Sequence, residues 1–140
     1  MARILAIDYG TKRVGIAVSD PLQIFASGLA TVRAHDALDF LNDYFLKEKV
    51  ECVVIGHPKK MNNQDSDAFH FIKLFEKNFK NKFPLIPVIL VDERFTSLLA
   101  REAMLRGGMK KKERQIKSNL DKISAAIILQ SYLDSKIYNR

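Results

Sequence analysis

Residues 4–20 read ILAIDYGTKRVGIAVSD, and this stretch determines the fold expected for the chain. Residues 3–7 are apolar on both faces of an expected strand, which is typical of a strand in the centre of a sheet. The turn that follows contains Gly10, which can adopt a positive φ, and residues 14–19 form an antiparallel partner strand. Asp8 then ends a central strand, where a carboxylate is costly unless something pairs with it.

The pattern around this hairpin extends the prediction to the rest of the chain. Small side chains alternate with large ones in residues 14–19, so one face is open to the close approach of another element or a ligand. A third strand near 28–32 completes a meander. The hydrophobic period then changes to 3.6 in residues 36–48, where Asp36 is the expected N-cap of a helix. Further strands are expected at 51–56 and 88–91, and further helices at 66–80, 97–106 and 119–133.

This order of elements predicts one α/β domain over residues 1–140. Its five-stranded mixed sheet would combine an antiparallel three-strand meander with parallel strands, and helices would cover both faces. Cys52, the single cysteine, is expected to be a buried strand residue, and the lack of a disulfide framework indicates a reducing cytoplasm. We recognise no signal peptide, and no apolar run approaches the ~20 residues that span a bilayer.

The net charge of +7 is distributed unevenly along the chain. The first 100 residues contain 13 Lys and Arg against 12 Asp and Glu, whereas the last 40 contain 10 against 4. Such asymmetry indicates a polyanionic partner, nucleic acid before membrane. A solvated basic surface that only aids solubility is the alternative.

Acidic residues follow several of the expected strands. Ligands of parallel sheets lie at the carboxyl ends of strands, and this rule singles out Asp8, His57 and the pair Asp92 and Glu93, each just beyond a predicted strand. Asp121 would lie in the first turn of the last helix, which has to pack across the sheet. Converging carboxylates repel unless cations neutralise them, and oxygen ligands suit Mg²⁺ or Mn²⁺. Two such ions about 3.5–4 Å apart can clamp a phosphodiester during hydrolysis.

Each acid also has a purely structural interpretation. Asp8 could cap its turn by accepting hydrogen bonds from nearby amides. One of the paired acids could cap the helix that follows, or form an ion pair with Arg94. The spacing from Ser118 to Asp121 fits a capping box. Spacing alone leaves these interpretations open beside the metal site.

Four motifs, in order along most of the chain, resemble the YqgF family, also called the RuvX-like or Holliday junction resolvase-like family. The resemblance implies a ribonuclease H-like fold and an association with the processing of pre-16S ribosomal RNA. The motifs are ILAIDYGTKRVGIAVSD at 4–20, VIGHPKKMNN at 54–63, VILVDERFTS at 88–97 with REAML at 101–105, and SNLDKISAAIILQSYLD at 118–134.

The resemblance also implies roles for individual residues. The catalytic carboxylates that bind divalent metal would be Asp8, Glu93 and Asp121, with Asp92 as a neighbour. Contacts with nucleic acid are expected from the turn after the first acid, from the residue after the second, and from the basic stretch before the last helix: Thr11, Lys12, Arg13, Arg94, Lys110, Lys111, Lys112, Arg114 and Lys117.

Two features depart from the family pattern. His57 occupies a position where an apolar residue is usual, and the segment that follows KKMNNQD at 59–65 lacks the usual glycine-containing turn, which changes the expected shape of this loop. We expect His57 to pack in the loop rather than to act in catalysis. His35 and His70 are assigned no role.

The sequence therefore predicts a metal-dependent nuclease, a hydrolase of ester bonds that processes pre-16S ribosomal RNA during ribosome biogenesis. Its partners would be structured RNA and a ribosomal subunit, and it would act as a monomer or a homodimer. A Holliday junction resolvase that acts on branched DNA is the first alternative. The others are a non-catalytic nucleic-acid-binding module and an actin-like nucleotide phosphate binder, for which 140 residues leave no second domain.

Overall fold

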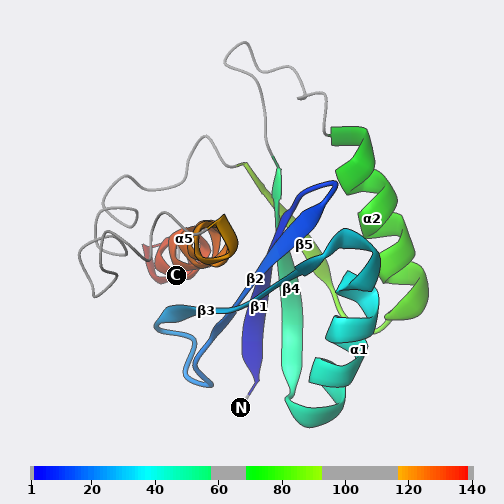
Figure 1. The fold of residues 1–140 in the computed structure, drawn as a ribbon. Coiled ribbons are helices and arrows are strands. Elements are labelled where there is room, and N and C mark those ends of the chain that lie inside the picture. Colours follow the sequence, from blue (N-terminus) through cyan, green and yellow to red (C-terminus); the bar gives the residue numbers. More distant parts are fainter. Residues whose placement is uncertain (1, 58–68, 93–116, 139–140) are drawn as a thin grey trace.

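The computed structural model describes residues 2–57, 69–92 and 117–138, the last segment with side chains only for 122–136. Within these ranges the chain forms one mixed sheet covered by helices on both faces (Figure 1). The strands are β1 (Arg3–Tyr9), β2 (Arg13–Ser19), β3 (Ala26–Arg33), β4 (Val50–His57) and β5 (Val88–Asp92). The helices are a 3₁₀ turn, η1 (Ala34–Asp36), and the α-helices α1 (Ala37–Lys47), α2 (Phe69–Lys82) and α5 (Lys117–Tyr138).

The order of the strands across the sheet is β3-β2-β1-β4-β5. β2 is antiparallel to both β1 and β3, whereas β4 is parallel to β1 and β5 is parallel to β4. The predicted five-stranded mixed sheet with its antiparallel meander is therefore confirmed. β1 lies in the middle of this order, as its apolar character on both faces predicts.

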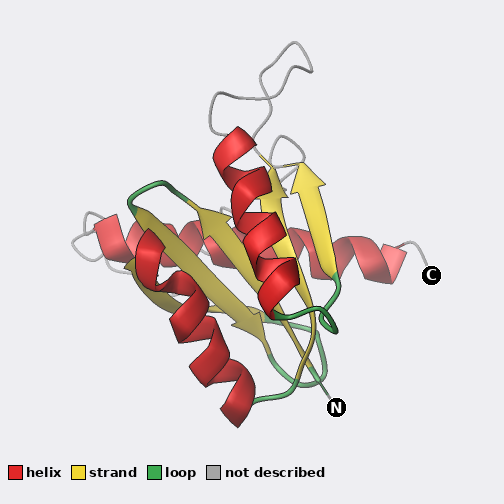
Figure 2. Ribbon diagram, turned by 90° about the vertical axis from the view of Figure 1, so that its right-hand side faces the viewer, coloured by secondary structure: helices red, strands yellow, loops and turns green. Residues whose placement is uncertain are grey.

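The sheet separates two cores, and the alternation of β1 shows how. Leu5 and Ile7 belong to the core under α1 and α2, whereas Ile4 and Ala6 belong to the core under α5. Figure 2 shows α1 and α2 together in front of the sheet, with α5 behind it. Cys52 is buried in the α5 core, as predicted.

The face of the meander with small side chains receives α5. Ala17 of β2 packs in the α5 core, and Gly28 is its partner on β3. A Cβ atom built on Gly28 would lie 2.9 Å from the Cβ atom of Lys122 in α5. The close approach predicted for this face is thus confirmed, and the element that approaches is the last helix.

The N-termini of α1 and α5 differ from the prediction. Asp36 does occupy the N-cap position of α1, but its side chain makes no capping hydrogen bond. Its backbone is helical (φ −98°, ψ −6°) because the 3₁₀ turn precedes it, whereas a capping side chain needs an extended backbone. α5 begins at Lys117, so Ser118 lies inside the helix and is not the N-cap of a capping box.

Asp20, at the end of the opening stretch, has a structural role. Its Oδ1 accepts hydrogen bonds from the amides of Ile24 and Phe25, both 2.8 Å, and its Oδ2 accepts one from Leu22 at 3.2 Å. The bond from Phe25 leads the effects that lower the pKa of the Asp20 carboxyl below its ordinary value of 3.8, and desolvation opposes them. Asp20 therefore fixes the loop that leads into β3.

None of the helices within the described ranges is both long enough and apolar enough to cross a membrane.

The contact between Gly28 and Lys122 gives a first prediction. We expect Gly28→Val to lower the free energy of unfolding by about 1–3 kcal/mol, because the added side chain overpacks a contact with the rigid Cβ of Lys122. Urea unfolding followed by circular dichroism measures this change. Ser27→Val is the matched control, because Ser27 is exposed on the neighbouring position of β3, and its effect is expected within about 0.5 kcal/mol. Equal losses in both variants would contradict the prediction.

Candidate functional site

Asp8 is the last residue but one of β1 and is half-buried. It pairs with Gly15 of β2. On its other side β1 is parallel to β4, and the last pair of that ladder is Ile7 with Ile55. Asp8 follows Ile7 and therefore lies beside Gly56, which follows Ile55. Both glycines are buried. The positions directly beside Asp8 on both neighbouring strands are therefore glycines.

The carboxylate belongs to the α5 side of the sheet. Asp8 alternates with Ile4 and Ala6, which pack in the α5 core, and successive side chains of a strand point to opposite faces. Asp121 lies near the start of α5, the helix that covers this face. The backbone thus brings the first and third predicted acids to the same side of the sheet. The side chain of Asp121 is outside the described residues.

His57 and Asp92 end β4 and β5 and are paired in the parallel ladder. They alternate with Ile55 and Leu90, which pack in or against the α1 and α2 core, so they belong to the face opposite Asp8. The His57 ring stacks on Phe69 of α2, with 4.3 Å between the ring centroids. His57 therefore packs against a helix, in keeping with the expected packing role.

The prediction that these residues lie just beyond their strands is wrong. Asp8, His57 and Asp92 are the final residues, or nearly so, of longer strands than expected. The reason is that ladder pairing with neighbouring strands extends each strand past the end of its apolar run. Strand alternation then places the side chains of Asp92 and Asp8 on opposite faces of the sheet. Asp92 was expected to be a neighbour of the metal site and not one of its principal ligands.

Most of the other predicted residues lie outside the described part of the chain. Glu93, Arg94, Lys110, Lys111, Lys112 and Arg114 are not described, and Lys117 and Asp121 are described only as helix backbone. Among the described side chains, no group of three or more His, Cys, Asp and Glu could hold a metal ion. Asp8 is the only predicted ligand in that set, so the convergence of the three acids stays a prediction.

The turn between β1 and β2 is compact. A Cβ atom on Gly10 would lie 2.6 Å from the carbonyl oxygen of Arg13. The expected reason for this glycine is wrong, since Gly10 does not adopt a positive φ; the lack of a side chain is what the turn requires. The amide of Ala34 donates a hydrogen bond of 2.9 Å to the carbonyl of Lys12, which ties the turn to the end of β3.

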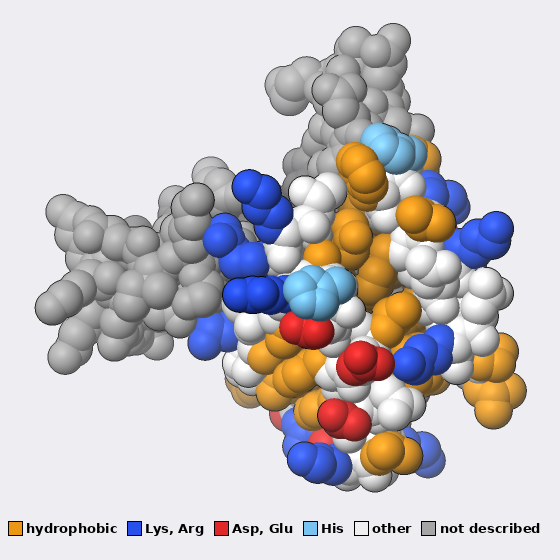
Figure 3. Space-filling model, turned by 45° about the vertical axis from the view of Figure 1, so that its right-hand side comes forward, with side chains coloured by type: hydrophobic (Ala, Val, Ile, Leu, Met, Phe, Trp, Pro, Cys, Tyr) orange, Lys and Arg blue, Asp and Glu red, His pale blue; other side chains and the backbone are white. Residues whose placement is uncertain are grey.

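A pocket of about 670 Å³ lies where this turn meets the end of β3. Figure 3 shows the basic side chains of this region gathered beside a histidine, with acidic side chains below. We call it the turn pocket, lined by Tyr9, Thr11, Lys12, Arg13, Arg33, Ala34 and His35.

The sequence predicted part of the turn pocket and missed the rest. Thr11, Lys12 and Arg13 were predicted to contact nucleic acid, and the structure brings them together. Arg33 and His35 were not predicted. Arg33 lies directly opposite Arg13 in the β2–β3 ladder, so the register of the meander is the signal that could have identified it.

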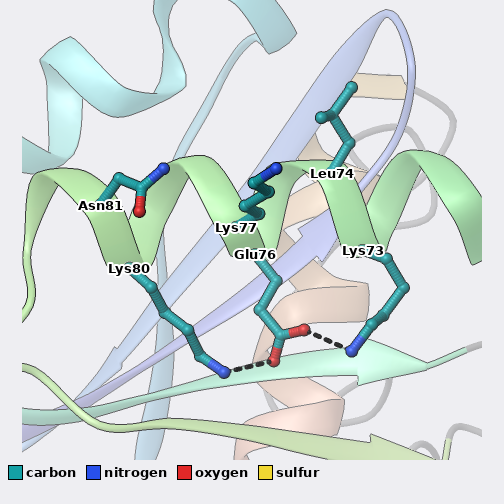
Figure 4. A pocket seen from close by; sticks show the side chains of 6 residues that line it. All are labelled: Lys73, Leu74, Glu76, Lys77, Lys80 and Asn81. Atoms are coloured by element: carbon teal, nitrogen blue, oxygen red, sulfur yellow. Dashed lines mark hydrogen bonds and ion pairs between the residues drawn. The ribbon is translucent and has the colours of Figure 1, made fainter.

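A second pocket, of about 570 Å³, lies along α2 (Figure 4). Its Glu76 is buried and forms two ion pairs. Glu76 Oε1 lies 2.8 Å from the Nζ atom of Lys73, and Oε2 lies 3.3 Å from the Nζ atom of Lys80. Desolvation raises the pKa of Glu76, but the hydrogen bonds and charges of the two lysines outweigh it, so the net pKa is lowered. Two of the three lysines of this pocket, Lys73 and Lys80, are therefore paired within the helix.

Comparison with known proteins agrees with this architecture. The sequence model of the family described as "RuvX: Holliday junction resolvase" matches residues 2–135. A protein of Phocaeicola vulgatus named "Putative pre-16S rRNA nuclease" is 59% identical over 138 residues, covering 99% of each chain. A protein of Flavobacterium johnsoniae with the same name is 57% identical over 136 residues, covering 97% of this chain and 99% of the relative.

Similarity to solved structures bears out the fold. The structure titled "T. thermophilus RuvC in complex with Holliday junction substrate" aligns with a TM-score of 0.59 over 97% of each chain, at 15% identity. A second Thermus thermophilus RuvC structure aligns with a TM-score of 0.51. RuvC has a ribonuclease H-like fold, so the predicted fold class is confirmed.

The tight turn generates the second prediction. We expect Gly10→Ala to lower the free energy of unfolding by about 1–3 kcal/mol, because its Cβ would displace the Arg13 carbonyl. Urea unfolding measures the loss. Thr11→Ala is the control: Thr11 is exposed on the same turn, and a change within about 0.5 kcal/mol is expected. A Gly10→Ala protein as stable as wild type would show that the turn has room for a side chain.

Proposed function

This chain belongs to the RuvX family, and from that premise we propose that it is a divalent-metal-dependent nuclease. It would hydrolyse phosphodiester bonds in structured nucleic acid, with a pre-16S ribosomal RNA as the first candidate substrate. The names of relatives that are 50–59% identical support this choice. The description of the family itself favours branched DNA as a second candidate substrate.

The observation that carries the proposal is the position of Asp8. A carboxylate at the carboxyl edge of the central strand occupies the usual place of ligand-binding residues in such sheets. The positions directly beside it on the two neighbouring strands are Gly15 and Gly56, which leave space for oxygen ligands, ions and a phosphate to approach. The α5 helix passes over the same face and carries Asp121 near its start.

The donor set fits Mg²⁺ or Mn²⁺. Asp8, Glu93 and Asp121 would hold the ions through carboxylate oxygens, which hard divalent cations prefer. Such ions, when bound, supply an activated water and neutralise the charge that develops on the phosphate. Glu93 follows directly after β5, which is parallel to β1 through β4. This order supports a location of Glu93 near the same sheet edge.

The remaining steps belong to the residues of the chain. Asp8 is held by ladder bonds of β1 to strands on both sides, so its carboxylate is positioned before the substrate arrives. Lys12 and Arg13, in the turn that follows, would hold a neighbouring phosphate and orient the backbone of the substrate. Such contacts fix the position of the substrate and do not read its sequence.

The third prediction tests this proposal directly. Asp8→Asn should reduce cleavage of a pre-16S ribosomal RNA in Mn²⁺ by at least about a hundredfold, because the central metal ligand loses its charge. Removal of metal with a chelator should reduce wild-type cleavage to the same background. Gel analysis of end-labelled RNA measures the products, and a four-way DNA junction tested in parallel separates the two candidate substrates.

Controls make this result interpretable. Asp43→Asn removes an equal charge from an exposed position of α1 and should leave cleavage unchanged. Calorimetric titration with Mn²⁺ should show that Asp8→Asn weakens metal binding while its circular dichroism spectrum stays that of wild type. Cleavage that survives Asp8→Asn would refute the proposed role of Asp8 and point to another site or a contaminant.

A further inference from the structure

Two arginines lie directly opposite one another at the edge of the sheet. The β2–β3 ladder pairs Arg13 with Arg33, and both are exposed. Like charges at directly opposite positions of an antiparallel pair destabilise a sheet. A bound anion would relieve this repulsion, because a planar guanidinium donates two parallel hydrogen bonds to a phosphate. The pair therefore presents two neighbouring guanidinium groups that a phosphate could bridge.

The turn pocket concentrates this positive charge. Lys12 lines it together with the two arginines, and none of the described residues that line it is acidic. Asp36 follows the pocket in sequence, and its carboxylate lies 3.5 Å from the Nε2 atom of the exposed His35. The α2 pocket differs, because there the buried Glu76 already binds two of the lysines (Figure 4).

The two arginines also have a fixed relation to Asp8. Gly15 pairs with Asp8 on one side and with Thr31 on the other, and Arg13 and Arg33 form the pair two residues further along. Strand alternation assigns all of these positions to one face. From the usual rise and spacing of strands, the Cα atoms of Arg13 and Arg33 lie roughly 8 Å and 12 Å from that of Asp8. The cations thus extend away from the carboxylate across the hairpin.

We propose that Arg33, together with Arg13 and Lys12, binds backbone phosphates of the nucleic acid beside the bond that is cleaved at Asp8. The proposal rests on the proposed nuclease function and adds Arg33 and a path for the substrate across the β2–β3 hairpin. Arg33 is a positioning residue, because it would hold phosphates away from the reacting atoms. The contacts are with phosphate, so RNA and branched DNA should depend on Arg33 equally.

Binding without cleavage tests the proposal. Fluorescence anisotropy in chelator, with a labelled RNA hairpin and a labelled four-way DNA junction, compares full-length wild type, Arg33→Gln and Lys47→Gln. Lys47 is the matched control, since it is an exposed cation in the last turn of α1 and does not line the turn pocket. Arg33→Gln should weaken binding of both ligands about 3–10-fold at 0.1 M salt. The negative slope of the logarithm of the association constant against the logarithm of the salt concentration should become shallower by about 1. Lys47→Gln should change affinity less than about twofold.

Stability measurements separate a binding role from a structural one. Because Arg33→Gln removes a like-charge pair, its urea midpoint should equal or exceed that of wild type. Equal binding by Arg33→Gln and Lys47→Gln would overturn the proposal. Weaker binding by Arg33→Gln together with a matching loss of stability would also overturn it. So would a rise in the melting temperature of wild type with ATP that is lost in Arg33→Gln, if the two proteins bind RNA equally.

The outcome is independent of the cleavage assay. Normal binding by Arg33→Gln, together with an inactive Asp8→Asn protein, would overturn only the role of Arg33. An active Asp8→Asn protein would refute only the role of Asp8 in cleavage, whatever Arg33→Gln does to affinity.

Discussion

The close packing of α5 on the small-residue face of the meander is the constraint on which the rest of the structure depends. A helix can lie this near to a sheet only where the strands carry little side-chain volume, and Ala6, Ala17 and Gly28 provide that face. The 2.9 Å between a Cβ built on Gly28 and that of Lys122 leaves no slack in the contact. Since Asp121 precedes Lys122, the packing that closes the second core also determines which side of the sheet the last acid approaches.

The sequence predicted the architecture because hydrophobic period and turn residues are local signals. β1 and β2 were predicted from residues 4–20, and the last helix was predicted from its Ile and Leu content. The cross-strand pairing of Arg33 with Arg13 could not be predicted from local signals. It depends on the register of β2 and β3 and on the bulge between Ile16 and Ala17. Local charge patterns identify basic segments, whereas pairing across strands decides which of them share a site.

The same distinction explains the errors at single residues. Asp36 has the right residue type and position for an N-cap, yet the 3₁₀ turn before it gives its backbone a helical conformation in which the cap does not form. Gly10 was predicted to use a positive φ, whereas the turn needs a glycine there because a Cβ atom would lie 2.6 Å from the carbonyl oxygen of Arg13. Both outcomes depend on the neighbouring turn, which sequence propensity does not specify.

The proposed arrangement of charges divides the work of binding between two regions at one end of the sheet. In the proposed arrangement Arg13 and Arg33 would attract a phosphate, whereas the carboxylate of Asp8 would repel it, and bound cations would reverse that repulsion. A nucleic acid would therefore dock on the turn pocket first and reach Asp8 only when divalent ions are present. If both regions were cationic, the backbone would bind without any requirement for metal at the reacting bond. Affinity and cleavage would thus depend on different residues, even though the ladder from Asp8 through Gly15 connects them within a few strand positions.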